Sequence, residues 1–432
     1  MRRALRYPGM CSLLVLLAAG GGTARAAVTA AEERIVAAVD ALQARFPRDL
    51  EQAVAIDSAT ENLAGVRQLA ELFAGQLREL GFDARFVALP ASTGRAGHLV
   101  AEHRGTKGKR ILLIGHLDTV YPGGNFRLEG DVAHGAGTGD MKGGDVVILH
   151  ALRALRDAGE LAEARIIVVM TGDEEAPGHP LEVVRRELND AAKRSDVALA
   201  FESAVGMTGT VARRGSISWL LEVRGETGHS SGIFSEEVGS GSVYEMARIL
   251  TGFHTELRAL DGVTCNPALV AGGADGDLTR TGGKVAGKTN IIPERTLARG
   301  DLRVTSPGQL AEAQRRMQAI VVRHNLPHTS ATLTFDEGYP PMPPTPANYA
   351  LLGELDQVSR DLGFGAITAF DPRARGAGDI AFVSPPLPGL DGLGLGGKGE
   401  HTRNESTDLG TAPGLVKRAA VLIHRLAQEN VP

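Results

Sequence analysis

Histidine and carboxylate residues stand directly after apolar runs of this sequence. His116 and Asp118 follow the run Ile111–Ile114, and Asp140 follows a glycine-rich stretch at 135–139. Alternate side chains of an extended chain share a face, so His116 and Asp118 are expected to point the same way. An isolated pair of this kind is more often structural, but imidazole and carboxylate groups gathered at strand ends indicate a metal site.

Further acidic residues occupy the same kind of position. Glu174 and Glu175 follow the apolar run 166–170, and Glu202 follows the run 197–201. Of two adjacent carboxylates, one can bind a metal while its neighbour accepts a proton from a bound water. An acidic pair alone is commonly a solvated loop. Three strands that each end in ligand candidates are more informative than any single motif.

A second histidine, His401, lies in the polar loop 399–405. Zinc and related metals use histidine together with carboxylate oxygen. Two histidines and three carboxylates can hold two metal ions that share one carboxylate. The competing interpretation is a nucleotide-binding loop at 135–144, but neither the G-x-G-x-x-G nor the P-loop pattern fits there.

Strand and helix patterns alternate through the first half of the chain and position these residues. They predict a mostly parallel, doubly wound α/β sheet, in which function sits at the carboxyl ends of strands. After residue 212 the pattern becomes β-α-β-β-α-β, typical of a small ferredoxin-like α+β domain, and α/β character returns after a proline-rich connector. The expected boundaries are a signal peptide at 1–26, a catalytic domain at 27–212 and 337–432, and an inserted domain at 213–336.

The first residues have the composition of a secretory signal peptide. Three arginines within the first six residues precede the apolar run Cys11–Ala19, and Ala24–Ala26 offers a cleavage site. The run is too short for a permanent membrane span. Its compactness favours a secretory signal over a mitochondrial presequence. A lipoprotein anchor is less expected, because its cysteine follows the apolar run, whereas Cys11 stands at the start of the run. We expect a periplasmic or secreted protein without a stable membrane anchor.

Bulk composition narrows the function classes. A net charge of −5 over 432 residues means that basic residues are not in excess, so no nucleic-acid partner is expected. A periplasmic binding protein would also combine a signal peptide with a two-lobed α/β body. That alternative gives no reason for ligand-type residues at so many strand ends.

Eight short motifs occur in the order found in metallopeptidases of the M20 family. They are GHLDTVYPGG, GTGDMKGG, TGDEE, FES, TGHSSG, TNIIPE, DLRV and GEHTRNES. From about residue 35 to the C-terminus the chain resembles this family, which includes glutamate carboxypeptidase, aminoacylase and succinyl-diaminopimelate desuccinylase. The resemblance implies that the inserted domain is a lid and dimerisation domain, and that the chain forms a homodimer through it.

The resemblance also implies two Zn2+ ions per chain, which Co2+ or Mn2+ can replace. The five implied metal ligands are His116, Asp140, Glu175, Glu202 and His401, with Asp140 shared by both ions. Glu174 would be the general base that takes a proton from a bound water, so that a metal-bound hydroxide attacks the amide. Asp118 would orient His116 and fix its tautomer.

Residues that contact the substrate are implied in the same way. His229 would stabilise the oxyanion of the tetrahedral intermediate, often in the active site of a partner subunit. Arg303 and Asn290 resemble residues that grip the substrate's carboxylate. Gly376 and Gly378 belong to a loop that resembles the family's glycine-rich loop beside that carboxylate.

The implied activity is that of a dizinc exo-carboxypeptidase of the glutamate carboxypeptidase type. It would act on a small peptide or an N-acyl amino acid and cleave an amide bond next to a free carboxylate. An N-acyl-amino-acid amidohydrolase, a dipeptidase and an aminopeptidase stay open as alternatives. Glu202 favours the carboxypeptidase and acylase branches, because many dipeptidases and aminopeptidases of the family carry Asp at this position.

Overall fold

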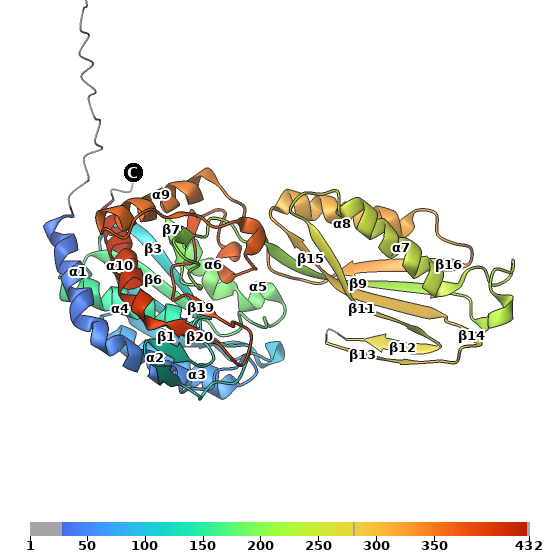
Figure 1. Ribbon diagram of the computed structural model, residues 1–432, viewed down its shortest axis with the longest axis horizontal. Coiled ribbons are helices and arrows are strands. Elements are labelled where there is room, and N and C mark those ends of the chain that lie inside the picture. Colours follow the sequence, from blue (N-terminus) through green and yellow to red (C-terminus); the bar gives the residue numbers. More distant parts are fainter. Residues whose placement is uncertain (1–27, 280, 430–432) are drawn as a thin grey trace, which may run out of the picture.

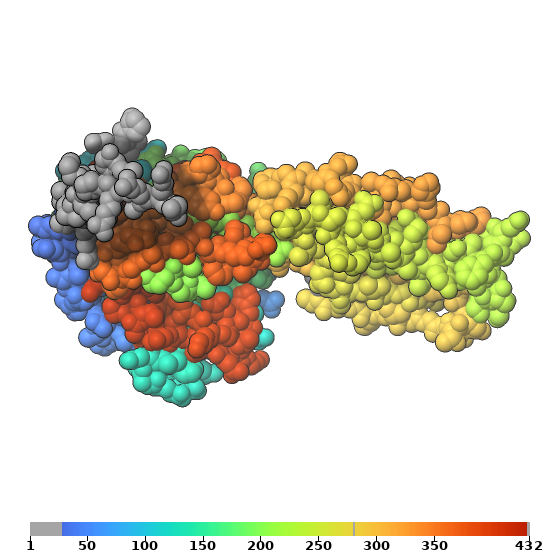
Figure 2. Space-filling model, turned by 45° about the horizontal axis from the view of Figure 1, so that its top comes forward, coloured from blue at the N-terminus to red at the C-terminus, as the bar shows by residue number. Residues whose placement is uncertain are grey.

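The computed structural model describes residues 28–279 and 281–429, which form two lobes (Figure 1). The predicted signal peptide lies outside the described residues. Both ends of the described chain belong to the first lobe, and the second lobe projects from it through a narrow junction (Figure 2). Within the described ranges, every helix is too short or too polar to cross a membrane.

The first lobe is built on a six-stranded sheet of order β1-β2-β6-β3-β7-β18. Its strands are β1 Asp83–Ala88, β2 Gly97–Arg104, β6 Ala164–Thr171, β3 Lys107–His116, β7 Val197–Ala200 and β18 Gly389–Leu390. The last four run parallel, while β1 and β2 pair antiparallel at one edge. The expected α/β class with a mostly parallel sheet is confirmed.

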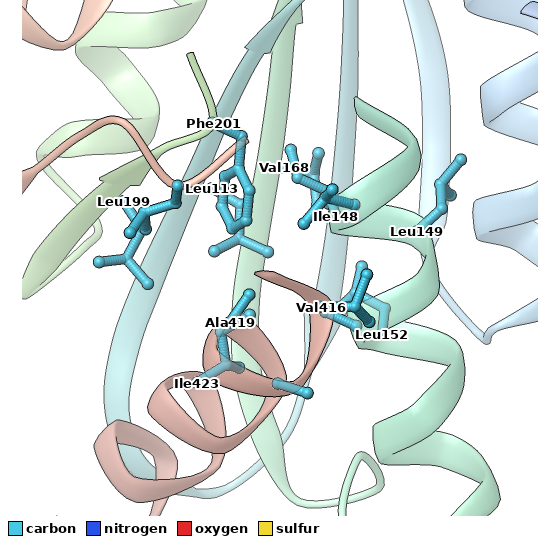
Figure 3. Close-up of a cluster of buried hydrophobic side chains, with 14 of the residues drawn as sticks. Leu113, Ile148, Leu149, Leu152, Val168, Leu199, Phe201, Val416, Ala419 and Ile423 are labelled. Carbon is cyan, nitrogen blue, oxygen red and sulfur yellow. The ribbon is translucent and has the colours of Figure 1, made fainter. Parts of the chain in front are cut away.

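Strand β3 is buried on both faces, as its uninterrupted apolar run predicts. Ile111 and Leu113 belong to the core under helices α4 (Lys142–Asp157) and α10 (Ala412–Gln428), where side chains of the sheet and both helices meet (Figure 3). Leu112 and Ile114 face the opposite core, with helix α6 (Arg186–Ala192). Burial of alternate residues on both faces fixes the position of the strand's polar end.

Hydrophobic residues recur at helical spacing through residues 31–80, which predicts helix there, and the structure divides this region into separate helices. These are α1 Ala30–Leu42, α2 Phe46–Val54 and α3 Leu63–Glu79. Pro47 lies in the first turn of α2, where its missing N–H costs nothing. Asn62 caps α3 by accepting a hydrogen bond from the Gly65 N–H. Hydrophobic periodicity alone did not reveal these breaks.

The second lobe contains an antiparallel sheet of order β11-β15-β9-β16 covered by two helices. Its elements are β9 Gly215–Gly225, α7 Gly241–Leu257, β11 Thr264–Gly273, β15 Arg295–Val304, α8 Pro307–Val322 and β16 Thr329–Phe335. Trp219 is fully buried in the core between this sheet and the helices. This order of strands and helices is the predicted β-α-β-β-α-β arrangement.

Two chain segments cross between the lobes and pair with each other. Arg213 and Ser216 on the outgoing segment form β-bridges with Met342 and Tyr339 on the returning segment. The Ser216 N–H donates to the Tyr339 carbonyl at 2.9 Å. The junction is therefore a short two-stranded connection.

A small sheet of order β19-β20-β5-β4 lies beside the large one in the first lobe. Its strands are β19 Gly397–Lys398, β20 Ser406–Asp408, β5 Val132–His134 and β4 Arg127–Glu129. Pairing of β20 with β5 joins the loop that carries His401 to the segment that leads into Asp140. This sheet brings residues more than 250 positions apart to one place.

Candidate active site

The carboxyl ends of the parallel strands converge on one cleft. His116 is the last residue of β3, the Glu174-Glu175 pair follows β6, and Glu202 follows β7. Asp140 precedes α4, and His401 lies in the loop between β19 and β20. Parallel strands end at the same edge of the sheet, so side chains from distant segments meet there.

The side chains form two groups that share Asp140. In the first, His116 Nε2 lies 3.1 Å from Asp140 Oδ1 and 3.7 Å from Glu202 Oε1. In the second, His401 Nε2 lies 3.1 Å from Asp140 Oδ2 and 3.2 Å from Glu175 Oε2. Within each group the potential ligand atoms all lie within 4.8 Å of one another. One imidazole nitrogen with two carboxylates in each group is a donor set that suits zinc.

The two sides of the His116 ring have separate functions. Nδ1 donates to the main-chain carbonyl of Asp118 at 3.0 Å, which leaves the lone pair of Nε2 facing Asp140. The Asp118 carboxylate accepts hydrogen bonds from the main-chain N–H groups of Glu174 at 2.9 Å and Glu175 at 3.1 Å. Asp118 therefore orients His116 through its carbonyl and holds the acidic pair through its side chain.

The backbone before Asp140 is held by a residue that the sequence did not single out. The buried Glu405 carboxylate accepts hydrogen bonds from the N–H groups of Gly137, Gly139 and Asp140, at 2.8, 2.8 and 2.9 Å. A carboxylate that binds three N–H groups fixes the loop strongly. The glycines thus supply N–H donors to a protein carboxylate, and Asp140 is set between the two histidines.

Crowding of acidic groups shapes their ionisation. Burial raises the pKa of Glu174 well above its usual range, and nearby Glu202 raises it further. Burial also raises the pKa of Glu202, to about 7, against the opposing effect of Arg213. Although burial opposes it, the two imidazoles hold the pKa of Asp140 below its usual range. Hydrogen bonding to Asp140 and Glu175 raises the pKa of His401 to about 11. Such a concentration of negative charge suits a multivalent cation.

The main chain of Glu174 is tied to the junction between the lobes. Tyr339 Oη donates to the Glu174 carbonyl at 2.8 Å and accepts from Arg185 Nη2 at 2.7 Å. Arg185 is fully buried and forms ion pairs with Asp173 at 2.6 Å and Asp379 at 2.9 Å. Sequence reasoning missed this cluster, which connects the segment carrying Glu174 to the crossing segment that carries Tyr339.

A cleft of about 500 Å³ is lined by members of both ligand groups, although not by the buried His116, and reaches the second lobe. Arg303, Gly376 and His179 are among the residues that line it. Arg303 Nε donates to Asp301 at 2.7 Å. Gly378 does not line this cleft, and a Cβ there would lie 2.6 Å from the guanidinium carbon of Arg213.

His229 and Asn290 lie far from this cleft in the same chain. His229 is exposed in β10 (Gly228–His229), which pairs with β14 (Ile291–Ile292) at the outer end of the second lobe (Figure 1). Strand β9 separates this end from the junction and spans roughly 30 Å at about 3.3 Å per residue. The structure therefore does not bring these two residues together with the ligand groups of the same chain.

Paired histidine–carboxylate groups at the ends of parallel strands, in a cleft beside a second lobe, define a metal-dependent hydrolase. The sequence model of peptidase family M20/M25/M40 matches residues 112–428. The chain therefore belongs to peptidase family M20. It is a hydrolase that acts on amide bonds.

Individual relatives differ in activity. Carboxypeptidase G2 of Pseudomonas sp. (strain RS-16) is 26% identical over 387 residues, covering 87% of this chain and 88% of the relative. Succinyl-diaminopimelate desuccinylase of Novosphingobium aromaticivorans is 30% identical over 269 residues, covering 57% and 66%.

Solved structures share the fold at lower identity. A tripeptidase from Staphylococcus aureus matches with a TM-score of 0.69 at 18% identity, over 90% of this chain and 99% of that one. An M20 metallo-carboxypeptidase from Sulfolobus solfataricus matches with a TM-score of 0.66 at 15% identity, over 88% and 98%.

Proposed function

We propose that this protein is a dizinc exo-carboxypeptidase that cleaves the amide bond next to a free α-carboxylate. The observation that carries the proposal is that Arg303 lines the same cleft as members of both ligand groups. A guanidinium fork suits bidentate binding of a carboxylate, so a substrate held there presents its adjacent amide to the ligand groups. The similarity to carboxypeptidase G2 over most of both chains supports this reading.

The residues of the two ligand groups fit zinc. His116, Asp140 and Glu202 would hold one ion, and His401, Glu175 and the same Asp140 the other. When bound there, zinc would polarise the scissile carbonyl and acidify the attacking water.

The remaining steps belong to side chains of this protein. Glu174 takes a proton from the attacking water and passes it to the leaving nitrogen. Its raised pKa, caused by burial and nearby Glu202, favours retention of the proton between the two steps. Asp118 holds Glu174 in place through the main-chain hydrogen bond.

A second candidate is an N-acyl-amino-acid amidohydrolase. The same cleft suits its substrate, because an N-acyl amino acid also carries its amide next to a free carboxylate. The similarity to succinyl-diaminopimelate desuccinylase supports this second candidate. Hydrolysis of N-acyl amino acids with no activity on peptides would select this candidate.

Metal removal tests the proposal directly. Dialysis against a chelator should lower activity on N-benzoyl-glycyl-L-glutamate to below about one-hundredth, and readdition of zinc should restore it at about two ions per chain. Full activity after complete removal of metal would contradict the proposal. A parallel panel of free-amine dipeptides and N-acyl amino acids would identify a dipeptidase or aminopeptidase instead.

We also propose that the protein is a homodimer in which His229 acts in the partner's cleft. His229 and Asn290 are exposed at the outer end of the second lobe, where a second copy of the chain can bring them to a ligand group of its partner. The inserted domain of this proposal has the predicted boundaries, after residue 212 and at residue 336.

We also propose that the protein acts outside the cytoplasm. Cell fractionation tests this proposal.

Complementation would reveal this exchange of residues. His229→Ala and Glu174→Gln homodimers should each be inactive, whereas a heterodimer of the two has one complete site. Statistical co-assembly should therefore restore about a quarter of wild-type activity. Persistent inactivity of a verified heterodimer would contradict the proposal.

A further inference from the structure

Arg375 differs from the other arginines that line the cleft. Its Nη2 donates to the Ser203 carbonyl at 2.6 Å, and its Nε has no hydrogen-bond partner among the described residues. Among those residues, no carboxylate lies within the 4.0 Å ion-pair distance of its guanidinium. Arg303, in contrast, is paired with Asp301 at 2.7 Å. Arg213 is paired with Asp391 and lies 3.5 Å from Glu202.

An unpaired cation in a half-buried position is costly unless an anion joins it. Arg375 has the Phe370 ring 5.9 Å away on one side, which restricts how the guanidinium can turn. Burial, together with the neighbouring Arg213, lowers the pKa of Arg375. Glu202 and Glu400 attract it only from a longer distance. Arg375 lines the cleft, so an anionic partner that the described residues do not supply can reach it from there.

Arg375 and Arg303 both line the cleft, and paired chain segments connect them. Arg214 Nη1 donates to the carbonyl of Arg373 at 3.4 Å, which joins the loop of Arg375 to the start of β9. Ser216, two residues beyond Arg214, pairs with Arg303 across β9 and β15. Through its bond to the Ser203 carbonyl, Arg375 is also one residue from Glu202 in the first ligand group.

We propose that Arg375 is a specificity-determining residue that binds the acidic side chain of a dicarboxylic C-terminal residue. This inference rests on the proposed function, in which Arg303 binds the α-carboxylate of the same residue. Two guanidinium groups that line one cleft match the two carboxylates of a dicarboxylic residue. A charge-assisted hydrogen bond is shorter and stronger than a neutral one, so an acidic side chain gains more here than an amide of the same shape.

The test compares two substrates that differ only in the side-chain charge, N-benzoyl-glycyl-L-glutamate and N-benzoyl-glycyl-L-glutamine. The wild-type kcat/KM should favour the glutamate substrate by about 10- to 100-fold, the range expected for a hydrogen bond to a charged group. Arg375→Gln should bring this ratio close to one, mainly by raising KM for the glutamate substrate. Product inhibition should change in parallel, with free L-glutamate losing its advantage over L-glutamine as an inhibitor.

Arg373→Gln is the matched control. Arg373 is an exposed arginine in the same loop, is paired with Asp371 at 3.1 Å and does not line the cleft. It should keep the wild-type preference. A wild-type ratio near one, or an unchanged ratio in Arg375→Gln, would overturn the inference while leaving the proposed carboxypeptidase intact. Failure to release the C-terminal residue from these two substrates and from any other peptide would overturn both the inference and the proposed carboxypeptidase activity. A wild-type ratio near one overturns the inference even if the Arg375→Gln variant folds poorly, because that ratio is measured without the variant.

Discussion

Replacing Glu174 with Gln is expected to lower kcat by about 100- to 10,000-fold, the usual contribution of a general base. Gln keeps the size of the side chain but cannot accept the proton of the attacking water. The hydrogen bonds that hold residue 174 use its main-chain N–H and carbonyl, which connect to Asp118 and Tyr339. The substitution should therefore leave the backbone and the KM almost unchanged.

The metal content of the variant distinguishes a role of Glu174 as general base from a role as metal ligand. Glu174 belongs to neither of the two groups of potential ligand atoms, so Glu174→Gln should retain about two zinc ions per chain. Glu400→Gln is the matched control, because Glu400 also lines the cleft and also lies outside both groups. It should keep activity within a few-fold. Near-normal turnover of Glu174→Gln would remove this residue from the role of base.

The second large effect is expected for Asp140→Asn, which should lose both metal ions together with activity. Asp140 directs one carboxylate oxygen toward each histidine. An amide replaces one of those oxygens by an NH2 group, which cannot serve as a ligand, and it removes the negative charge that both ions would share. Zinc measured by mass spectrometry of the purified variant should fall from about two per chain to below one.

His401→Ala provides the contrast that makes this prediction specific. It removes a ligand from one group only, while His116, Asp140 and Glu202 remain together. The variant should keep about one ion per chain and lose most of its activity. If Asp140→Asn retained as much zinc as His401→Ala, Asp140 would not be the shared ligand. Circular dichroism should show that both variants keep the wild-type secondary structure.

The local sequence predicted the part of the site that strand ends create. The apolar run of β3 requires burial on both faces, which leaves His116 at its polar end. The same reasoning applies to Glu174 after β6 and Glu202 after β7. These residues could be found without a structure because parallel strands end at the same edge of a sheet. His401 follows no apolar run, so its place depended on the family motif.

Residues that support the site gave no local signal. Glu405 binds the Asp140 N–H from 265 positions away, and Tyr339 binds the Glu174 carbonyl from 165 positions away. Their partners are main-chain groups, which every residue possesses, so no pattern of residue types identifies such a contact. Arg375 was missed for a related reason. Its significance lies in the absence of a nearby carboxylate among the described residues, which only the packed structure shows.

The sequence by itself determined the class of fold, the type of side chain at each strand end and the division into α/β and α+β parts. Only the tertiary structure decided which of these side chains meet. It brought Arg303 to the cleft and placed His229 and Asn290 at the opposite end of the second lobe. The physical reason is that strand and helix patterns depend on neighbours along the chain, whereas the site depends on strand order, strand length and the pairing of distant segments.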